Sequence, residues 1–584
     1  MGKAYLVLMG ILLCSKLYES ASNSLWRWKC NQSAGACTRV SGDVDATLYP
    51  SLETCRLVCG TAGGLWPQPT VGTVLSDGLF QFSLSSLKFE FASEDNDVTT
   101  YLKEIADLFN KTLSSISASN CSNTDNTVTI SIVVLTNNMD LNWKTDEGYN
   151  LEILTAGKEN SVKISANTIF GARHALETVS QLIELFSNNN GEVCHVIVDE
   201  AKISDAPNYN HRGLLLDTAR NFLSISSIKK HVDGMAHSKL NVLHWHITDS
   251  QSFPLELPTL PNMTKYGAYS DSKIYHPTDI AELISYAKLR GVRIIIEIDA
   301  PSHAGNGWQW GPDAGLGDLS VCINQQPWRS FCIQPPCGQL NPVNSNLYKV
   351  LKDLYSDVIN MLPKGEVFHM GGDEVYIPCW NSTPEIIAYL GDKPRTTETF
   401  LDLWSDYQAQ ALEAFDSAVG NTNTPIILWT SHLTEVSVIE KYLSKTRYVI
   451  QTWVPAADTL PQNLLDLGYQ IIASTKDTWY LDHGFWGNTV YHNWRVVYNN
   501  KIPTASGTLG GEVCMWGELV DDSSVESRVW PRAAAAAERL WSNPKTNADQ
   551  AERRFYRHRE RLVSRGINAE ALTPRWCYQN EGEC

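Results

Sequence analysis

Short apolar segments recur along the second half of the chain, and each one ends in a polar cluster. Eight of them alternate with stretches long enough to form a helix. They lie at residues 213–217, 242–248, 292–298, 367–370, 426–429, 448–453, 470–474 and 512–516. Eight buried strands alternating with helices are the pattern of an α/β fold, the (β/α)8 TIM barrel. An open doubly wound sheet is the structural alternative for the same pattern.

The chain before these segments has a different pattern. Residues 127–134 are rich in β-branched side chains, and residues 148–154 and 161–165 continue the strand signals. Residues 171–186 carry apolar side chains three or four positions apart, which predicts a helix as far as Phe186. We therefore expect a smaller α+β domain over residues 66–205, followed by the barrel over residues 206–584.

The first 22 residues are expected to be a signal peptide. Lys3 precedes an apolar run from Tyr5 to Cys14, and residues 20–22 offer small side chains for cleavage. An uncleaved N-terminal anchor is the alternative. The run is too short for a bilayer, and no later run reaches the ~20 apolar residues of a membrane helix. We expect a secreted, extracellular protein without a membrane span, with the lysosome as the alternative compartment.

Cysteine usage agrees with an oxidising compartment. The sequence has 14 cysteines, and loss of Cys14 with the signal peptide leaves an odd number, which suggests pairs plus one free thiol. Residues 23–65 hold four cysteines in a piece too poor in apolar residues for its own core, so a disulfide-stapled extension is predicted. A zinc site is the alternative there, although the cysteine spacing is poor for a zinc ribbon.

The sequence alone does not determine which cysteines pair. Nested pairs in the N-terminal cluster and local closure elsewhere keep the loops short. On that basis we expect Cys30–Cys59, Cys37–Cys55, Cys121–Cys194, Cys322–Cys379, Cys332–Cys337 and Cys577–Cys584. Cys514 lies in an apolar, strand-like stretch and is expected to be the free, buried thiol.

Composition narrows the possible functions. Lys and Arg number 47 against 64 Asp and Glu, a formal net charge of −17 without a basic stripe, which is unfavourable for binding nucleic acid. The 19 Trp and 23 Tyr residues suit a site that stacks flat, weakly charged ligands. Five Asn-x-Ser/Thr sequons behind a signal peptide indicate a glycoprotein. They begin at Asn31, Asn110, Asn120, Asn262 and Asn381.

Two adjacent carboxylates follow the fourth predicted strand, in the sequence His369-Met-Gly-Gly-Asp373-Glu374. Neighbouring acids raise one another's cost of ionisation, so one pKa should rise. A carboxyl that stays protonated near neutral pH can act as a general acid. An isolated Asp-Glu pair is usually a solvated turn, but chemistry in a TIM barrel sits where the strands end, which favours a catalytic role.

Neighbouring strand ends supply partners for these acids. The second strand runs from His244 to Asp249 and the third from Glu297 to His303. An Asp–His–carboxylate relay would orient and tune Glu374 through hydrogen bonds. The two histidines of the second strand could be metal ligands, but we expect barrel-interior histidines with satisfied hydrogen bonds, because no partner set with zinc spacing appears. We therefore expect neither a metal nor another cofactor.

Aromatic side chains gather at the same strand ends. Trp429, Trp453 and Trp516 close the fifth, sixth and eighth strands and suggest an aromatic cup. Further polar and aromatic groups lie after the first, seventh and eighth strands, and no phosphate loop, nucleotide fingerprint or serine elbow is present. Trp, carboxylates and Arg together suit a carbohydrate ring, whose hydroxyls meet the charged groups. These further residues are Arg220, Tyr480, Asp482, Trp494 and Glu518.

Segments 211–220, 244–246, 369–374, 479–482 and 514–518 resemble the β-N-acetylhexosaminidases of glycoside hydrolase family 20. The similarity runs from about residue 70 to the end. The Cys-rich piece and the Trp494 loop look more like arthropod chitooligosaccharide-degrading members than lysosomal ones. The resemblance implies an exo-acting enzyme that removes terminal, non-reducing N-acetylglucosamine, or N-acetylgalactosamine, from chitooligosaccharides or glycoconjugates. We expect a homodimer that acts on carbohydrate, with no nucleic-acid partner.

The resemblance also implies a substrate-assisted, retaining mechanism. Glu374 would be the general acid and later the base, supported by Asp249 and His303. Asp373 would orient the 2-acetamido group, whose oxygen attacks the anomeric carbon and gives an oxazolinium ion. Further residues would bind the sugar. Tyr480 would bind the acetamide oxygen, and the methyl group would be surrounded by Trp429, Trp453 and Trp516. The hydroxyls would be bound by Arg220, Asp482 and Glu518. The second sugar would be stacked by Trp494 and flanked by Gln334.

Three other functions fit parts of the pattern. An inactive, lectin-like protein that binds N-acetylglucosamine would need neither Asp373 nor Glu374 as a proton donor. A two-carboxylate glycosidase would need a second acid about 5 Å away, for which Asp299 and Glu518 are the rough candidates. A storage or structural glycoprotein leaves the acids at the strand ends unexplained.

Overall fold

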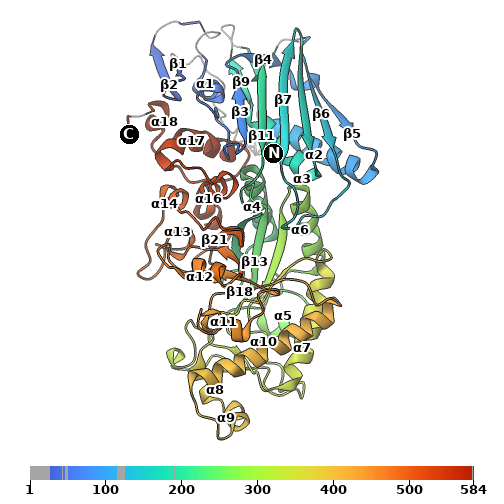
Figure 1. Ribbon diagram of the computed structural model, residues 1–584, viewed down its shortest axis with the longest axis vertical. Coiled ribbons are helices and arrows are strands. Elements are labelled where there is room, and N and C mark those ends of the chain that lie inside the picture. Colours follow the sequence, from blue (N-terminus) through green and yellow to red (C-terminus); the bar gives the residue numbers. More distant parts are fainter. Residues whose placement is uncertain are drawn as a thin grey trace, which may run out of the picture.

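The structure is a computed structural model that describes residues 26–41, 44–45, 50–114, 121, 125–187, 192–581 and 583–584. The predicted signal peptide and the sequon at Asn120 lie outside the described residues. The β-rich N-terminal part stands at the top of Figure 1, the barrel lies below it, and the C-terminal helices run along one side.

Eight strands form a closed parallel barrel, which confirms the predicted (β/α)8 fold. The last strand pairs with the first, with His211 opposite Gly510. Every residue of β13 and β14 is buried, since helices cover the outside and packed side chains fill the inside. The strands are β12 (His211–Asp217), β13 (Val242–Thr248), β14 (Arg293–Ile298), β17 (Phe368–His369), β18 (Ile426–Trp429), β19 (Tyr448–Thr452), β20 (Gln470–Ala473) and β21 (Thr508–Met515).

Longer and shorter helices connect the barrel strands or, as with α15 and α16, follow the last one. The longer ones are α4 (Ile225–Ser238), α6 (Pro277–Leu289), α7 (Ser345–Met361), α10 (Thr397–Val419) and α16 (Arg532–Ser542). The shorter ones are α5 (Asn262–Gly267), α8 (Ile377–Ser382), α9 (Pro384–Leu390), α11 (Ile439–Tyr442), α12 (Leu460–Asp466), α13 (Lys476–Trp479), α14 (Trp494–Asn499) and α15 (Val525–Val529).

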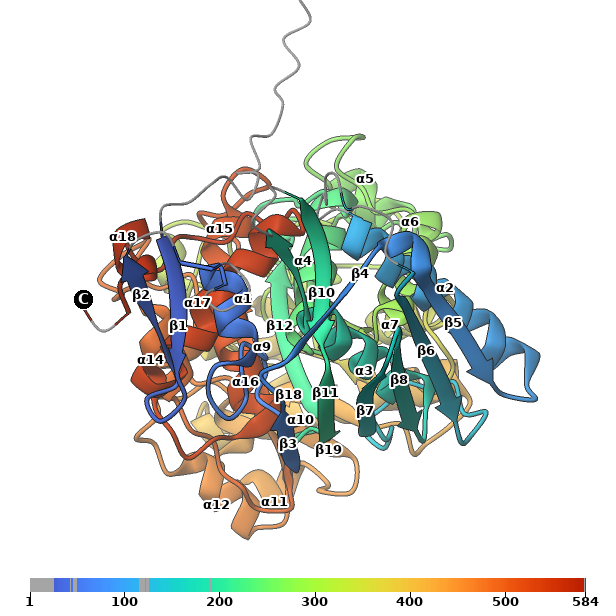
Figure 2. The ribbon, with the colours of Figure 1, turned by 90° about the horizontal axis from the view of Figure 1, so that it is seen from above.

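A six-stranded mixed sheet, in the order β3-β11-β7-β8-β6-β5, precedes the barrel. Buried and exposed residues alternate along β7, so one face of the sheet packs against α2 and α3 and the other meets solvent. This sheet and the N-terminal hairpin lie on opposite sides of the view from above (Figure 2). The elements are β3 (Gly72–Leu75), β5 (Leu87–Ala92), α2 (Asn96–Ser114), β6 (Thr127–Val134), β7 (Tyr149–Ala156), β8 (Glu159–Ala166), α3 (Ile169–Gln181) and β11 (Glu200–Asp205).

The predicted helix over residues 171–186 is wrong at its end. Helix α3 stops at Gln181, and residues 183–187 form strand β9 (Ile183–Ser187). Strand β9 pairs with β10 (Val193–Val198), with Leu185 opposite His195, and β10 also pairs with β4 (Leu79–Phe82). Apolar spacing continued past the helix end, but pairing with a strand further along the chain determines the conformation there.

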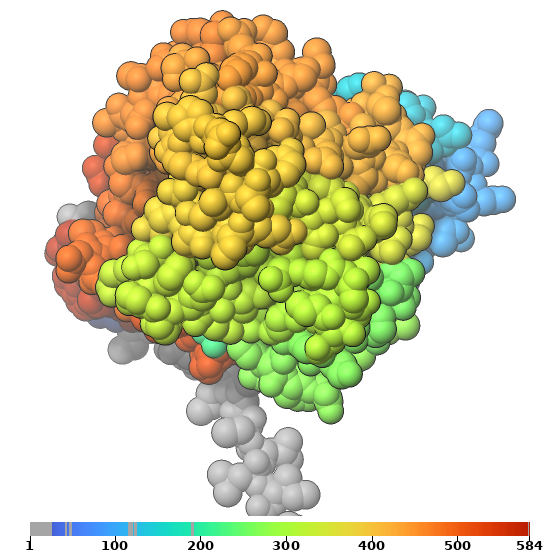
Figure 3. Space-filling model, turned by 90° about the horizontal axis from the view of Figure 1, so that it is seen from below, coloured from blue at the N-terminus to red at the C-terminus, as the bar shows by residue number. Residues whose placement is uncertain are grey.

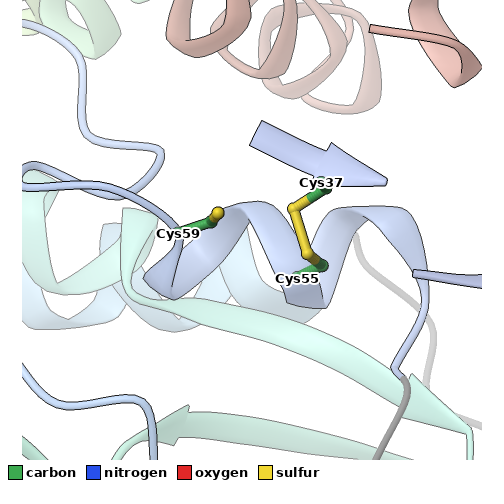
Figure 4. A group of neighbouring side chains, drawn as sticks. All are labelled: Cys37, Cys55 and Cys59. Atoms are coloured by element: carbon green, nitrogen blue, oxygen red, sulfur yellow. A yellow bond between two sulfur atoms is a disulfide. The ribbon is translucent and has the colours of Figure 1, made fainter. Parts of the chain in front are cut away.

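The Cys-rich extension is a hairpin and one short helix joined by two disulfides. Strands β1 (Trp26–Asn31) and β2 (Ala36–Ser41) lead to α1 (Leu52–Val58). Figure 4 shows the bond from Cys37 to Cys55 on α1, with Cys59 at the end of this helix. The extension packs against Tyr556 and Tyr578, on α17 (Ala548–Ser564) and α18 (Arg575–Gln579), so it joins the two ends of the chain.

All six expected disulfides are present, and Cys514 is free and buried. Of the sequons that the structure describes, Asn31, Asn110 and Asn381 are exposed and Asn262 is half-buried. Among the described residues, no helix combines the length and the apolar character needed to cross a membrane.

The loop between β6 and β7 closes the end of the barrel where its strands begin, on the side of the N-terminal domain. Trp143 packs against an aliphatic ring contributed by the barrel strands and donates its indole N–H to His211 at 3.2 Å. Glu147 pairs with Arg212 at 2.7 Å, and both side chains are buried. Separating the two domains would leave each of these buried charges without its partner, which is costly, so the ion pair holds the N-terminal domain against the barrel. The ring is Val242, Ile295, Val367, Ile427, Val449, Ile472 and Leu509.

Candidate active site

The site lies where the barrel strands end. The face seen from below in Figure 3 is built mainly of the yellow-green, yellow and orange segments, which include loops after the middle barrel strands. Asp373 and Glu374 follow β17 through Gly371 and Gly372. A Cβ atom at Gly371 would lie 1.8 Å from Asp299 Oδ1, so only glycine fits there. Glu374 itself has φ +48°, an unusual conformation that is typical of functional sites.

A hydrogen-bonded relay supports Glu374. Asp249 Oδ1 lies 3.2 Å from His303 Nδ1, and His303 Nε2 lies 3.3 Å from Glu374 Oε2. Burial lowers the pKa of His303, but Asp249 and Asp299 outweigh it and hold the pKa well above its ordinary value. Burial raises the pKa of Glu374, but the hydrogen bond and charge of His303 outweigh it and lower the pKa. One proton is therefore shared between His303 Nε2 and Glu374 Oε2, and before a ligand binds it rests on His303.

Asp373 has a different environment from its neighbour. Burial raises its pKa to about 6, with Glu374 adding to the rise and His303 opposing it. Burial also holds the pKa of Asp299 well above its usual range, which favours a protonated carboxyl that can donate to Asp373. Asp299 Oδ1 accepts the N–H of Gly372 at 3.0 Å. Among the described residues, buried Asp373 Oδ1 has no hydrogen-bond partner, which leaves it able to accept a ligand N–H.

Arg220 is fixed by two carboxylates and one amide. Its guanidinium lies 3.1 Å from Asp217 Oδ2 and 2.8 Å from Asp249 Oδ2. It also donates to Gln334 Oε1 at 3.0 Å, and Gln334 donates to Glu518 Oε1 at 2.9 Å. Glu518 Oε2 has no partner within the described chain. The Cys332–Cys337 disulfide closes the loop that carries Gln334 and so brings this amide between Arg220 and Glu518.

The expected aromatic cup is present as a cluster. Trp429 lies 5.9 Å from Trp516, and Tyr480 lies 6.1 Å from Trp516 between ring centroids. Trp453 packs against the same group, and Leu215 and Cys514 are buried with it. Burial holds the pKa of Tyr480 well above its usual range, so its hydroxyl remains a donor. The cup can hold a small apolar group and donate a hydrogen bond from Tyr480 to a polar acceptor attached to that group.

Asp482 lies on the loop after β20, as expected, but Trp494 does not face the site beside it. Burial raises the pKa of Asp482 to about 7, and its Oδ2 accepts the indole N–H of Trp486 at 2.9 Å. Trp494 was expected to stack a second sugar, and this is wrong. It is only 5% exposed, and its ring lies 4.6 Å from Phe555 in the main core. Trp486 is 40% exposed and occupies the loop instead.

The histidines of β13 face carboxylates rather than an open coordination site. Both ring nitrogens of His244 lie within 2.8 Å of Glu512 or Glu297 oxygens. His244, Glu297 and His369 are close enough to share a metal ion, but the two imidazole rings stack with centroids 4.6 Å apart. Nitrogen lone pairs lie in the ring plane, so stacked rings do not converge on one ion. Burial lowers the pKa of His244, but the two carboxylates outweigh it and raise the pKa to about 9, so His244 carries the proton here.

The sequence reasoning assigned no role to Glu297 or Trp486 in the site. Glu297 lies under the cup, where its Oε1 accepts the indole N–H of Trp429 at 2.7 Å. Its spacing of two from Asp299 on a strand was the available signal, because alternate residues of a strand point to the same side. Trp486 lies in a loop, where no periodicity indicates which of several aromatic residues faces the site.

Comparison with known proteins gives consistent matches along the chain. Residues 209–544 match the glycosyl hydrolase family 20 catalytic domain, and residues 65–182 match a domain described as beta-acetyl hexosaminidase like. The chitooligosaccharidolytic beta-N-acetylglucosaminidases of Bombyx mori and Ostrinia furnacalis are each 40% identical. The alignments cover 98% and 99% of this chain, and 98% of each relative.

Proteins from more distant organisms also match. The human beta-hexosaminidase subunit beta is 35% identical, over 75% of this chain and 74% of that protein. The crystal structure of a Flavobacterium johnsoniae chitobiase superposes with a TM-score of 0.68 at 25% identity. That superposition covers 86% of this chain and 73% of the chitobiase chain.

Proposed function

The chain belongs to glycosyl hydrolase family 20 and is a β-N-acetylhexosaminidase, and from this premise we propose a substrate and a mechanism for it. It removes the terminal, non-reducing N-acetylglucosamine of chitooligosaccharides. The substrate's own acetamido group is the nucleophile, and the anomeric configuration is retained. The printed names of the two insect relatives support this substrate class.

One observation carries the mechanism: within the described part of the chain, the buried Asp373 Oδ1, beside Glu374 and the aromatic cup, has no hydrogen-bond partner. An acetamido group supplies what these side chains lack. Its N–H would donate to Asp373, its carbonyl oxygen would accept from Tyr480, and its methyl group would fill the cup. Hydrogen bonding at both ends would hold the carbonyl oxygen under the anomeric carbon, in the position of an intramolecular nucleophile.

The proton for the leaving group comes from the pair His303 and Glu374. When sugar covers the half-buried Glu374 carboxylate, loss of water disfavours its charge, and the proton moves from His303 Nε2 to Glu374 Oε2. Glu374 then protonates the glycosidic oxygen as the bond to the anomeric carbon breaks. Asp249 stabilises His303 in the orientation that this transfer needs.

The second half of the reaction reverses these roles. The acetamide oxygen has bonded to the anomeric carbon, giving an oxazolinium ion whose N–H is held by Asp373. Glu374, now a carboxylate, removes a proton from water as the water oxygen attacks the anomeric carbon. The carbon–oxygen bond to the acetamide breaks, and the acetamido group and the proton held near Glu374 are both restored.

Arg220, Glu518 and Asp482 would bind the hydroxyls of the terminal sugar. Glu518 Oε2 and Asp482 Oδ1 are buried acceptors without partners among the described residues. The bridge from Arg220 through Gln334 to Glu518 closes one side of the pocket, which supports removal of end sugars rather than internal cleavage. For the second sugar we propose Trp486, since its partly exposed ring lies beside Asp482.

The wider setting is also a proposal. Six disulfides fit an extracellular or lysosomal enzyme, and we propose secretion after removal of residues 1–22. We propose glycosylation at the sequons, a homodimer, and domain limits of 23–65, 66–205 and 206–584.

Two measurements test this function. Glu374→Gln should lower hydrolysis of N-acetylglucosaminides with poor leaving groups by ~10²–10⁴-fold while the fold is retained. Wild-type turnover by this variant would contradict the assignment, and an inactive wild-type protein that still binds the sugar would favour a lectin. Comparing rates on chitotriose and on a branched N-glycan then tests the substrate class, and faster cleavage of the glycan would contradict it.

A further inference from the structure

Glu297 lies beneath the site, on β14 two residues before Asp299, and is fully buried. The proposed mechanism gives it no step, because it faces neither sugar nor water. A buried carboxylate is costly unless each oxygen has a partner. Burial raises the pKa of Glu297, but three neighbouring histidines outweigh it and hold the pKa well below its usual range, so the group is an anion.

One oxygen of Glu297 leads to the general acid. Glu297 Oε2 lies 2.7 Å from His246 Nδ1, and His246 Nε2 lies 3.0 Å from Asp249 Oδ2. The other oxygen of Asp249 holds His303, which reaches Glu374. Both nitrogens of His246 face carboxylates, so His246 is a cation whose position fixes that of Asp249. We refer to this path, Glu297–His246–Asp249–His303–Glu374, as the acid arm.

The other oxygen leads to the cup. Glu297 Oε1 accepts the indole N–H of Trp429 at 2.7 Å. Trp429 is 1% exposed, and this hydrogen bond sets the angle of its ring against Trp516, where the acetamide methyl group would lie. We refer to the pair Glu297–Trp429 as the cup arm. The geometry therefore gives each oxygen of one carboxylate a different task.

We propose that Glu297 is a positioning residue that aligns the general acid and the acetamide cup with each other, a role that rests on the proposed function above. The acetamide oxygen must attack on one side of the anomeric carbon while Glu374 protonates the leaving oxygen on the other. One buried carboxylate that contacts both sides fixes the position of Glu374 relative to the acetamide cup. Small misplacements of reacting groups lower the rate strongly.

Glu512 provides a matched control. It is equally buried and also lies between two histidines, His211 at 2.9 Å and His244 at 2.6 Å. It accepts a further hydrogen bond from Gln451 at 2.8 Å. Among the described residues it pairs with neither His246 nor Trp429, although the His244 ring that it holds also lies 2.8 Å from Glu297 Oε2. Glu297→Gln and Glu512→Gln each remove one buried charge of the same interior. Only the first alters both arms, because the single acceptor oxygen of Gln can serve Trp429 or His246 but not both.

The experiment compares these variants on aryl N-acetylglucosaminides with good and with poor leaving groups, and with an N-acetylglucosamine thiazoline as inhibitor. Glu297→Gln should lower kcat/KM about 10²-fold for poor leaving groups and much less for good ones, because only the former need the acid. It should also weaken thiazoline binding about tenfold, because the one remaining acceptor oxygen no longer serves both arms. Glu512→Gln should change each value less than threefold.

Equal losses in both variants, or a loss in Glu297→Gln that is the same for all leaving groups, would overturn the proposal. If Glu297→Gln does not fold, two variants test the arms singly. His246→Gln should raise only the sensitivity of the rate to the leaving group, and Trp429→Phe should weaken only thiazoline binding. The proposal is also overturned if the two variants exchange these effects or if neither variant changes either quantity. Failure of the proposed function would look different, because the unaltered enzyme would then be insensitive to the thiazoline.

Discussion

Trp143 in the N-terminal domain donates its indole N–H to His211 in the first barrel strand, across 3.2 Å. The guanidinium carbon of Arg293 lies 4.8 Å from the centre of the Trp143 ring on the barrel side. The two domains therefore share a polar and an aromatic contact at the end of the barrel where its strands begin, opposite the strand ends that carry the residues proposed to bind sugar. This contact makes the α+β domain part of the barrel's stability.

Replacing Trp143 should show this coupling. Trp143→Ala should destabilise the protein by about 2–3 kcal/mol, less than for a fully buried Trp because the ring is half-buried. Trp143→Phe keeps most of the packing and should cost about 1 kcal/mol for the lost hydrogen bond. Urea unfolding followed by Trp fluorescence and by circular dichroism measures both. Unchanged stability in Trp143→Ala would contradict the coupling.

Substitution of Gln334 tests how the terminal sugar is bound. Gln334→Ala removes the bridge between Arg220 and Glu518, so both side chains gain freedom and should bind sugar hydroxyls less well. We expect KM for a small aryl substrate to rise about three- to tenfold with kcat nearly unchanged.

A second variant separates the amide from the loop that carries it. Replacing Cys332 and Cys337 together by Ser keeps Gln334 but opens its loop, and should raise KM in the same direction. Steady-state kinetics at fixed pH measures both variants. A fall in kcat with constant KM would show that Gln334 acts in the chemical step instead.

Much of the barrel could be predicted from sequence, because parallel strands buried on both faces read as continuous apolar runs. Even β17, with only Phe368 and His369 assigned as strand, was located by the apolar run before its acids. The acids, His303 and the cup were found because the ends of successive strands meet at one face of a barrel. These residues could be located from the order of strands and polar clusters along the sequence, without knowledge of contacts between distant segments.

Other features depend on contacts that the order along the chain does not encode. Trp494 is at a helix start and packs on Phe555 of α17, which nothing near it in sequence indicates. The end of α3 was missed for the same reason, since β9 exists through its pairing with β10. Glu297 looked like any strand residue until the structure placed its two oxygens against His246 and Trp429.

The pH dependence of kcat/KM follows from the two acids. Asp373 must be ionised to accept the acetamide N–H, and burial raises its pKa to about 6, so activity should fall as pH drops through about 6. The pair His303 and Glu374 must keep its proton, and carboxylates hold the pKa of His303 well above its ordinary value against the effect of burial. The basic limb should therefore lie above neutral pH.

His303→Asn makes this prediction sharper. It removes a positive charge that lowers the pKa of Asp373, so the acidic limb should move to higher pH while the rate falls. Rates between pH 4 and 10 on an aryl substrate measure both limbs. Constant kcat/KM down to pH 4 in the unaltered enzyme would contradict the role of Asp373.

Asp299 and Asp373 lie side by side, yet their amide variants should behave in opposite ways. Burial holds the pKa of Asp299 well above its usual range, so its carboxyl is already a neutral donor, with Oδ1 accepting from Gly372. Asn has the same shape and can donate to Asp373 while accepting from Gly372. Asp299→Asn should therefore keep activity within about tenfold, whereas Asp299→Ala, which lacks the donor, should lose more.

Asp373→Asn replaces the acceptor that would hold the acetamide N–H, so it should lower kcat by about 10²–10³-fold on N-acetylglucosaminides. A plain glucoside has no acetamido group, so its already slow cleavage should be nearly unaffected by the same change. Kinetics on the paired substrates measures this difference, and a 2-fluoro glycoside with mass spectrometry looks for a covalent intermediate. An inactive Asp299→Asn would contradict the neutral carboxyl of Asp299. A sugar found bonded to Asp299, Asp373 or Glu518 would show that a protein carboxylate, and not the substrate's acetamide, is the nucleophile.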